Sequence, residues 1–246
     1  MNKSGIETEA FMLQSDGIAL RVFVATPRPV NAPLPSVQIH HGGGGYEQAY
    51  EHMALEMAQR GFAGITMIHR GYPGSQGQME YGKGEITDIG SLAEEIAARS
   101  DIDEQRMGIM GYSRGAHNAL LAVERYDYFR AGALWSAPVD MVDHVQVNPW
   151  IAEMFEGLPD DAPEAYRMRS SIYFVERIGC PLLLLHGESD DVIPVRHSLR
   201  LARAMEKLNK PFELKVFKNE GHIWSPPAFR NNWQLTINFF ERHLLV

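Results

Sequence analysis

The sequence predicts an α/β protein with a mostly parallel central sheet, and two observations lead to this prediction. Short apolar runs rich in branched residues alternate along the chain with segments of helical period. No Gly/Ser-rich or charged linker divides the 246 residues, so residues 1–246 are expected to form a single domain. Strands that alternate with helices favour a parallel sheet with helices on both faces and ligands at the carboxyl ends of the strands.

The first two strands depart from the parallel pattern. Residues 7–13 and 18–24 alternate between apolar and polar side chains, and Ser15-Asp16-Gly17 between them is typical of a hairpin turn. An antiparallel N-terminal hairpin is therefore expected. Six further strands are predicted at residues 37–39, 63–68, 107–110, 132–135, 181–185 and 214–217.

The segments between these strands predict helices, because their apolar residues recur at helical spacing. The predicted helices cover residues 51–60, 85–99, 116–125, 195–208 and 228–243. Between residues 136 and 179 the alternation breaks, and Asn148-Pro149 looks like an N-cap followed by proline at the first helical position. This insertion is expected to form a short helical cap.

Residues 111–115 (Gly-Tyr-Ser-Arg-Gly) match the pattern G-x-S-x-G. They directly follow a predicted strand and directly precede a predicted helix. In that setting a sharp turn lifts the serine hydroxyl above the sheet, and the glycines relieve crowding around a strained backbone. An ordinary glycine-rich turn is the alternative. The strand-to-helix setting favours Ser113 as a nucleophile.

A nucleophilic serine needs a base and a carboxylate that orients the base. In proteins of the α/β-hydrolase fold the chain order is nucleophile, acid, histidine. The predicted strand at 181–185 leads into the acidic loop 186–194, and the strand at 214–217 leads into Glu220-Gly221-His222. Of the ten histidines, only His222 combines this order with a loop position, so His222 is expected to be the general base.

A glycine loop follows the predicted strand at 37–39. Residues 40–46 read His-His-Gly-Gly-Gly-Gly-Tyr and resemble the loop that supplies one oxyanion donor in this fold. Only glycine lets the backbone approach a substrate so closely. The expected donors are the backbone N–H groups of Arg114 and of Gly43 or Gly44, with a flexible surface loop as the alternative.

Two glycine patterns could suggest nucleotide binding, and both are incomplete. The glycines at 42–45 lack the third glycine of a dinucleotide loop, since Glu47 stands in its place. Residues 77–84 match G-x-x-x-x-G-K but lack the following Ser or Thr that would hold magnesium. The sequence also contains no H-E-x-x-H motif or Cys/His cluster. No cofactor and no catalytic metal are therefore expected.

The composition restricts the partners. A formal net charge of −8 argues against nucleic acid, because phosphate binding needs clustered Lys and Arg. The sequence shows neither a signal peptide nor about 18 consecutive apolar residues, so we expect no membrane association and a cytoplasmic location. Cys180, the single cysteine, is expected to be buried and unreactive. A small-molecule ester or a short peptide is the expected substrate, and the oligomeric state stays open.

Together these motifs resemble the catalytic domain of the prolyl oligopeptidase family of serine hydrolases, over roughly residues 40–243. Residues 70–77 (Arg-Gly-Tyr-Pro-Gly-Ser-Gln-Gly) are similar to the arginine–glycine loop of that family, residues 103–109 to its approach to the nucleophile, and residues 136–139 to its segment after the next strand. Residues 186–194 match its pattern H-G-x-x-D-x-x-V-P with Ile193 in place of Val. The resemblance places the catalytic aspartate of the family on Asp190.

The resemblance also shapes the expected activity. Peptidases of this family usually carry an N-terminal β-propeller that gates access, whereas only 39 residues precede His40 here. Without a propeller, the chain is expected to be a carboxylesterase for small substrates that forms an acyl-enzyme. A serine peptidase acting on short peptides and a non-catalytic hydrolase-fold binding protein are the alternatives. Aromatic residues, which could also be plain core, are candidates to line an apolar substrate pocket: Tyr46, Tyr112, Trp150, Phe155, Tyr173 and Trp224.

Overall fold

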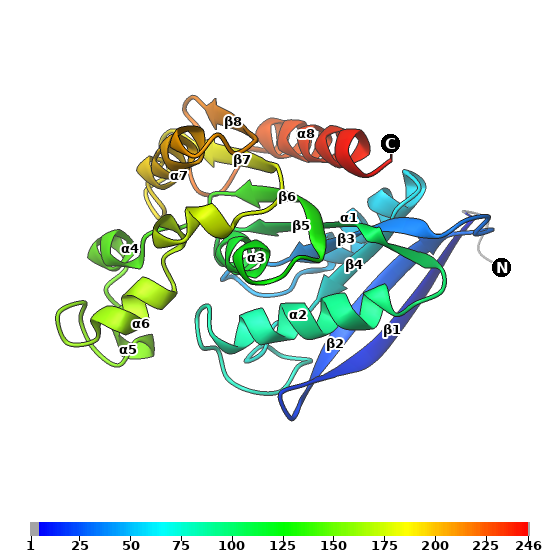
Figure 1. Cartoon of the computed structure of the whole chain (residues 1–246), viewed down its shortest axis with the longest axis horizontal. Helices are drawn as coiled ribbons and strands as arrows, with labels where there is room; N and C mark the ends of the chain where they lie inside the picture. Colours follow the sequence, from blue (N-terminus) through cyan, green and yellow to red (C-terminus); the bar gives the residue numbers. More distant parts are fainter. Residues whose placement is uncertain (1–4, 246) are drawn as a thin grey trace.

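The computed structural model describes residues 5–245, and its centre is one eight-stranded sheet (Figure 1). The strand order is β1-β2-β4-β3-β5-β6-β7-β8. Neighbouring strands from β4 to β8 are parallel, whereas β1 with β2 and β2 with β4 are antiparallel. The strands are β1 (Ile6–Ser15), β2 (Ile18–Pro27), β3 (Leu34–His40), β4 (Ala63–Met67), β5 (Ile102–Tyr112), β6 (Phe129–Trp135), β7 (Leu182–Gly187) and β8 (Phe212–Phe217). This is the α/β-hydrolase fold, as the sequence predicts.

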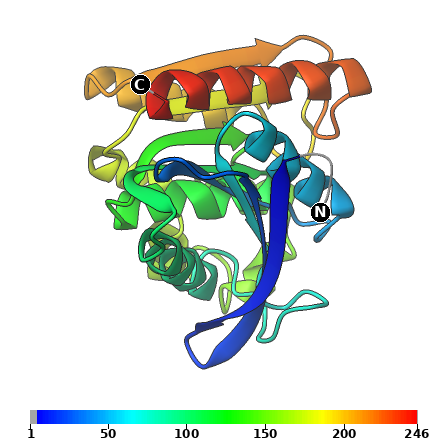
Figure 2. The same ribbon diagram turned by 90° about the vertical axis from the view of Figure 1, so that its right-hand side faces the viewer.

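The predicted N-terminal hairpin forms one edge of the sheet. Ser15 pairs with Ile18 across a two-residue turn in which Asp16 has φ 50° and Gly17 has φ 75°. Two positive φ values give the turn a twist that matches the twist of the strands, which explains the Asp-Gly pair. Figure 2 shows the hairpin as a long curved ribbon, with α8 at the opposite end of the sheet.

Five long helices cover both faces of the sheet. On one face α2 (Gly84–Ala97), α3 (Arg114–Arg125) and α7 (Arg196–Lys207) contribute to one apolar cluster. On the other face α1 (Gln48–Gln59) and α8 (Pro226–Leu244) contribute to a second cluster. Because both faces are buried, the central strands are uninterrupted apolar runs, and all five residues of β4 are buried.

The insertion between β6 and β7 forms the predicted cap. It contains α4 (Met141–Val147), α5 (Ile151–Met154), α6 (Pro163–Met168) and two 3₁₀ turns, Ser171–Tyr173 and Val175–Arg177. Figure 1 shows α4, α5 and α6 gathered at one end of the molecule, away from the β1–β2 hairpin. The cap has a small apolar core of its own that includes Tyr81, a residue from the loop between β4 and α2.

The expected N-cap at Asn148 is wrong. Asn148 closes α4, with its N–H donating to the carbonyl of His144, and α5 begins only at Ile151. Pro149 has no N–H to continue the hydrogen bonds of α4, so it follows the end of one helix rather than opening the next. The side-chain amide of Asn148 instead donates to the carbonyl of Val192, at 2.9 Å.

None of the helices in residues 5–245 is both long enough and apolar enough to cross a bilayer.

Candidate active site

Ser113 lies in the sharp turn between β5 and α3. Its backbone has φ 56° and ψ −120°, a conformation that L-residues rarely adopt. The N–H of Ser113 donates to the carbonyl of Trp135 at 2.8 Å, which ties the turn to the end of β6. A Cβ on Gly111 would lie 2.2 Å from the Gly115 carbonyl carbon, and a Cβ on Gly115 would lie 2.2 Å from the His40 oxygen. Both glycines of the G-x-S-x-G pattern are therefore required by close backbone contacts.

Three side chains from separate loops meet in one hydrogen-bonded series. The Oγ of Ser113 lies 2.9 Å from Nε2 of His222, and Nδ1 of His222 lies 2.8 Å from Oδ2 of Asp190. An ionised carboxylate can only accept, so Nδ1 carries the hydrogen and Nε2 is left to accept from the serine hydroxyl. This is the geometry of a nucleophile, its general base and an orienting acid.

The environment of Asp190 keeps it ionised. Its Oδ1 accepts from the N–H groups of Val192 and Ile193, at 3.0 and 2.7 Å. Burial acts to raise the pKa of Asp190, but hydrogen bonds from His186 and His222 outweigh it and hold that pKa well below the usual range of a carboxyl. The neighbouring Asp191 is exposed. The structure thus joins Asp190, and not Asp191, to the histidine.

Tyr112 holds the loop that carries His222. Its hydroxyl donates to the His222 carbonyl at 2.7 Å, and the two rings stack with centroids 5.3 Å apart. Glu220 closes the same loop by accepting from the N–H and the hydroxyl of Ser225. The sequence offers no signal for the Tyr112 tether, because its partner is a main-chain carbonyl 110 positions away.

Three neutral histidines fix the path of the glycine loop. Nε2 of His41 accepts from the N–H of His69 at 3.0 Å, and Nδ1 of His41 donates to the Gly42 carbonyl at 2.9 Å. His40 Nδ1 lies 3.0 Å from His69 Nε2. Burial lowers the pKa of His40 to about 3 and that of His41 to about 4, so these rings are uncharged at neutral pH.

Three residues with unpaired backbone N–H groups lie beside Ser113. Gly43 and Gly44 line it, and within residues 5–245 their N–H groups have no protein acceptor. The N–H of Arg114 stands at the first position of α3, where a helix leaves its donors unpaired. The hydroxyl of Tyr72 donates to the Gly43 carbonyl at 2.8 Å and so helps to orient the loop. Unpaired N–H groups of this kind are what an oxyanion requires.

The site opens into a cavity of about 630 Å³, which is the size range of small-molecule pockets. Ser113 and His222 line it, together with three of the aromatic residues that the sequence suggested: Tyr112, Trp150 and Trp224.

The structure places the other three aromatic candidates elsewhere. Tyr46 does not line the cavity; its hydroxyl donates to Glu51 at 3.2 Å and its ring centre lies 5.9 Å from that of His41. Phe155 is buried in the core of the cap, where its ring packs against that of Tyr166. Tyr173 is exposed on a 3₁₀ turn at the surface. The sequence around these aromatic residues does not distinguish a cavity wall from a core. Their positions follow from the packing of the folded chain.

Sequence reasoning missed much of the cavity wall. Tyr72, Met79 and Tyr81 come from the loop between β4 and α2, whereas Tyr50 and Met53 come from α1. The loop follows the carboxyl end of β4, so the rule that ligands bind at strand ends would have suggested it. Further lining residues are Glu47, Ala49, Met110, Trp135, His144, Asn148, Val192, Ile193, Ile223 and Phe229.

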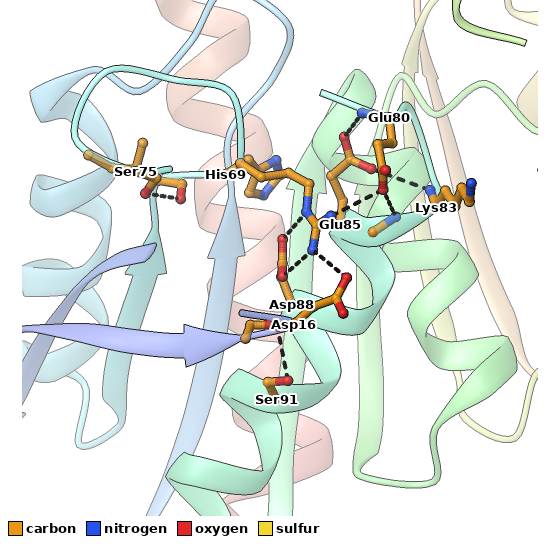
Figure 3. A network of polar contacts seen from close by, with 12 residues as sticks. Asp16, His69, Ser75, Glu80, Lys83, Glu85, Asp88 and Ser91 are labelled. Carbon is orange, nitrogen blue, oxygen red and sulfur yellow. Dashed lines mark hydrogen bonds and ion pairs between the residues drawn. The ribbon is translucent and has the colours of Figure 1, made fainter. Parts of the chain in front are cut away.

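A buried carboxylate organises the loop between β4 and α2 (Figure 3). The two oxygens of Glu85 accept from the N–H groups of four consecutive residues, 80–83, at 2.8 to 3.3 Å. One oxygen of Glu80 accepts from the N–H of Gly84 at 2.7 Å. The backbone donors of residues 80–84, in the second half of the G-x-x-x-x-G-K pattern, are therefore bonded to carboxylates of the chain itself.

Residues 5–245 contain no group of three His, Cys, Asp or Glu side chains placed to hold a metal ion. Ser113 and His222 line the apolar cavity, and Asp190 lies behind His222.

The fold and this site define a serine hydrolase of the α/β-hydrolase fold. Residues 49–245 match the model of the prolyl oligopeptidase family, peptidase family S9, and the chain belongs to this family.

Similar proteins carry peptidase names. An uncharacterised peptidase of Bacillus subtilis, YtmA, is 25% identical over 181 residues, which cover 72% of this chain and 70% of that one. Human dipeptidyl peptidase 8 is 30% identical over 184 residues, but these cover only 20% of its length. A puromycin-hydrolysing peptidase of Mycobacterium tuberculosis has the same fold, with a TM-score of 0.89 at 22% identity over 99% of this chain and 40% of that one. The chain thus spans less than half of the last two proteins.

Proposed function

We propose that this chain is a serine peptidase that cleaves short peptides through an acyl-enzyme on Ser113. The observation that supports this most directly is the unbroken series of hydrogen bonds from Ser113 through His222 to Asp190. A binding protein has no use for such a series beside unpaired backbone N–H donors, so the non-catalytic alternative is disfavoured.

The proposed reaction has two steps. Ser113 Oγ attacks the carbonyl carbon while its proton passes to Nε2 of His222, and the N–H groups of Arg114 and of Gly43 or Gly44 stabilise the oxyanion. His222 then gives the proton to the leaving amine as the C–N bond breaks. In the second step water attacks the acyl-enzyme, its proton passes to His222, and the acid is released as Ser113 regains its proton.

The choice between amide and ester substrates follows the family and the relatives. The sequence led us to expect small esters, whereas the family is one of peptidases and the named relatives hydrolyse dipeptidyl or puromycin substrates according to their names. Ester cleavage stays the second candidate because the cavity wall is mostly aromatic and aliphatic, which suits a simple acyl group.

A labelling and turnover experiment tests this proposal. An organophosphonate probe is expected to label wild-type protein on Ser113 and to leave Ser113→Ala unlabelled. Aminoacyl and dipeptidyl arylamides are then compared with p-nitrophenyl acetate and butyrate, with Ser113→Ala as the blank. Arylamide turnover supports the peptidase; turnover of esters alone would select the esterase. If the probe does not label the wild-type protein, the non-catalytic binding protein becomes the favoured alternative.

A further inference from the structure

The Arg114 side chain occupies an unusual position for a charged group. It follows Ser113 in the chain and lines the same cavity, yet the residue is only 4% exposed. Its guanidinium contacts the Tyr72 hydroxyl and the Met79 sulfur, and it lies 4.8 Å from the centre of the Tyr72 ring. Its Nε is buried and has no hydrogen-bond partner among residues 5–245.

This buried cation has no anionic partner in the described chain. Within residues 5–245, no carboxylate oxygen lies within 4.0 Å of the Arg114 nitrogens. Burying a charge is costly unless the charge is paired. Arg70 shows the usual solution, because it is 5% exposed and binds both oxygens of Asp88, at 2.7 and 2.8 Å. Within residues 5–245 one buried arginine is therefore paired with a carboxylate, whereas another, which lines the cavity, is not.

The acidic residues of the adjacent loop are already engaged (Figure 3). Both oxygens of Glu85 accept from backbone N–H groups. One oxygen of Glu80 binds Arg70 and the N–H of Gly84. Glu47 lines the cavity as well but is solvent-exposed. None of these carboxylates neutralises Arg114, so its charge is available to a ligand in the cavity.

We infer that the Arg114 guanidinium binds a carboxylate of the substrate close to the bond that Ser113 cleaves. A guanidinium presents a planar fork of donors that matches a carboxylate. The N-terminal end of α3 also favours negative charge at this position. Because an extended residue spans about 3.5 Å, the carboxylate lies within roughly two residues of the scissile bond. The substrate class is a short peptide with either a free C-terminal carboxylate or an acidic side chain at that position.

This inference rests on the proposed function for the position of the scissile bond. Its test measures binding and requires no bond cleavage. The protein is Ser113→Ala, and the ligands are blocked dipeptides whose binding is measured by titration calorimetry. One matched pair is acetyl-Ala-Phe and acetyl-Ala-Phe-amide, and the other is acetyl-Ala-Glu-amide and acetyl-Ala-Gln-amide. We expect the acid of one pair to bind roughly 10- to 100-fold more tightly than its neutral partner. The sensitive pair identifies the source of the carboxylate.

Variants of Arg114 then test whether this side chain causes the preference for the acid. Arg114→Met in the Ser113→Ala background is expected to reduce the ratio between acid and neutral ligand to near one, and Arg114→Lys is expected to give an intermediate ratio because it keeps the charge and loses the fork. Arg167→Met is the matched control, since Arg167 is exposed on α6 and does not line the cavity.

Three results would overturn the inference: equal binding of both members in both pairs, no binding of any ligand, or an acid preference that survives in Arg114→Met. The first two are read without any Arg114 variant, so a misfolded variant does not obscure them. Labelling of Ser113 by the organophosphonate is measured separately, which distinguishes failure of the carboxylate site from failure of the peptidase proposal.

Discussion

Ser113 stands in a strained backbone conformation that its surroundings impose. A residue held in a sparsely populated region of φ and ψ costs about 1–3 kcal/mol. The bond from its N–H to Trp135 and the close packing of Gly111 and Gly115 against neighbouring backbone fix the turn. The sequence could indicate this turn because only glycine permits such contacts.

At the residue scale, the adjacent residues Asp190 and Asp191 are expected to differ in their effect on activity. Asp190 orients the histidine, whereas Asp191 is exposed to solvent. We expect Asp190→Asn to lower kcat on the order of 10⁴-fold, because the histidine loses the partner that fixes its tautomer, and Asp191→Asn to change it less than about threefold. Steady-state kinetics with one arylamide and one ester measure both variants. Equal losses, or a larger loss in Asp191→Asn, would move the acid to the next residue.

The meeting of Ser113, Asp190 and His222 was predictable from the chain, but most of their supports were not. Chain order and strand ends point to Ser113, to His222 and to the acidic loop 186–194, since parallel strands bring their carboxyl ends to one edge, and the family resemblance places the acid on Asp190. The Tyr112 tether depends on where a distant carbonyl lies. Phe155 and Tyr173 show the same limit, because an aromatic side chain has no local pattern that tells a cavity wall from a core.

At the element scale, the predicted strands and helices correspond to observed ones. Their first and last residues differ from the prediction where polar residues cap or extend the element. The last helix was predicted from residue 228 and begins at Pro226, because Ser225 caps it by accepting from the N–H of Ala228. β5 begins at Ile102, five residues before the predicted start, because Ile102 pairs with Leu34 ahead of the polar residues 103–106, which are not buried. Apolar periodicity shows the buried part of an element and not its polar ends.

The contact between α3 and the glycine loop leads to a prediction about Gly115. Gly115→Ala places a Cβ 2.2 Å from the His40 oxygen and 2.6 Å from the His41 oxygen. Overpacking of this kind costs about 1–3 kcal/mol or more, and here it also displaces the glycine loop. We expect lower stability to urea and loss of organophosphonate labelling. Gly179→Ala is the control, because its Cβ meets nothing within 4 Å; wild-type labelling of Gly115→Ala would contradict the prediction.

The loop between β4 and α2 gives a second prediction at this scale. Glu85→Gln replaces an acceptor oxygen with an amide group that faces backbone N–H donors. We expect a loss of about 1–3 kcal/mol of stability and a raised KM, because the loop presents Met79 and Tyr81 to the cavity. Urea unfolding and steady-state kinetics measure these effects, with Glu164→Gln on the exposed face of α6 as the control. An unchanged KM in a destabilised Glu85→Gln would show that the loop does not shape the binding site.

At the scale of the whole molecule, the fold holds many imidazoles in uncharged form. Burial is the main cause that lowers the pKa of six buried histidines: His40 and His144 to about 3, His41, His117 and His197 to about 4, and His69 well below 6.5. They form two groups, one under the glycine loop and one between α3, the cap and α7. The sequence shows ten histidines but not how many become buried.

These histidines predict that stability falls as the solution is acidified below neutrality. In the unfolded chain each titrates near 6.5, whereas in the folded protein each stays neutral to about pH 4, so acid favours the unfolded state that binds more protons. Each such histidine removes about 1 kcal/mol between pH 7.0 and 5.5, before the depressed pKa of Asp190 has any effect. We expect the free energy of unfolding in urea to fall by several kcal/mol over this range. His117→Gln should flatten the slope by about one sixth, and the exposed His52→Gln should leave it unchanged. A stability that is constant or rises from pH 7.0 to 5.5 would show that these imidazoles are not buried neutral in the folded protein.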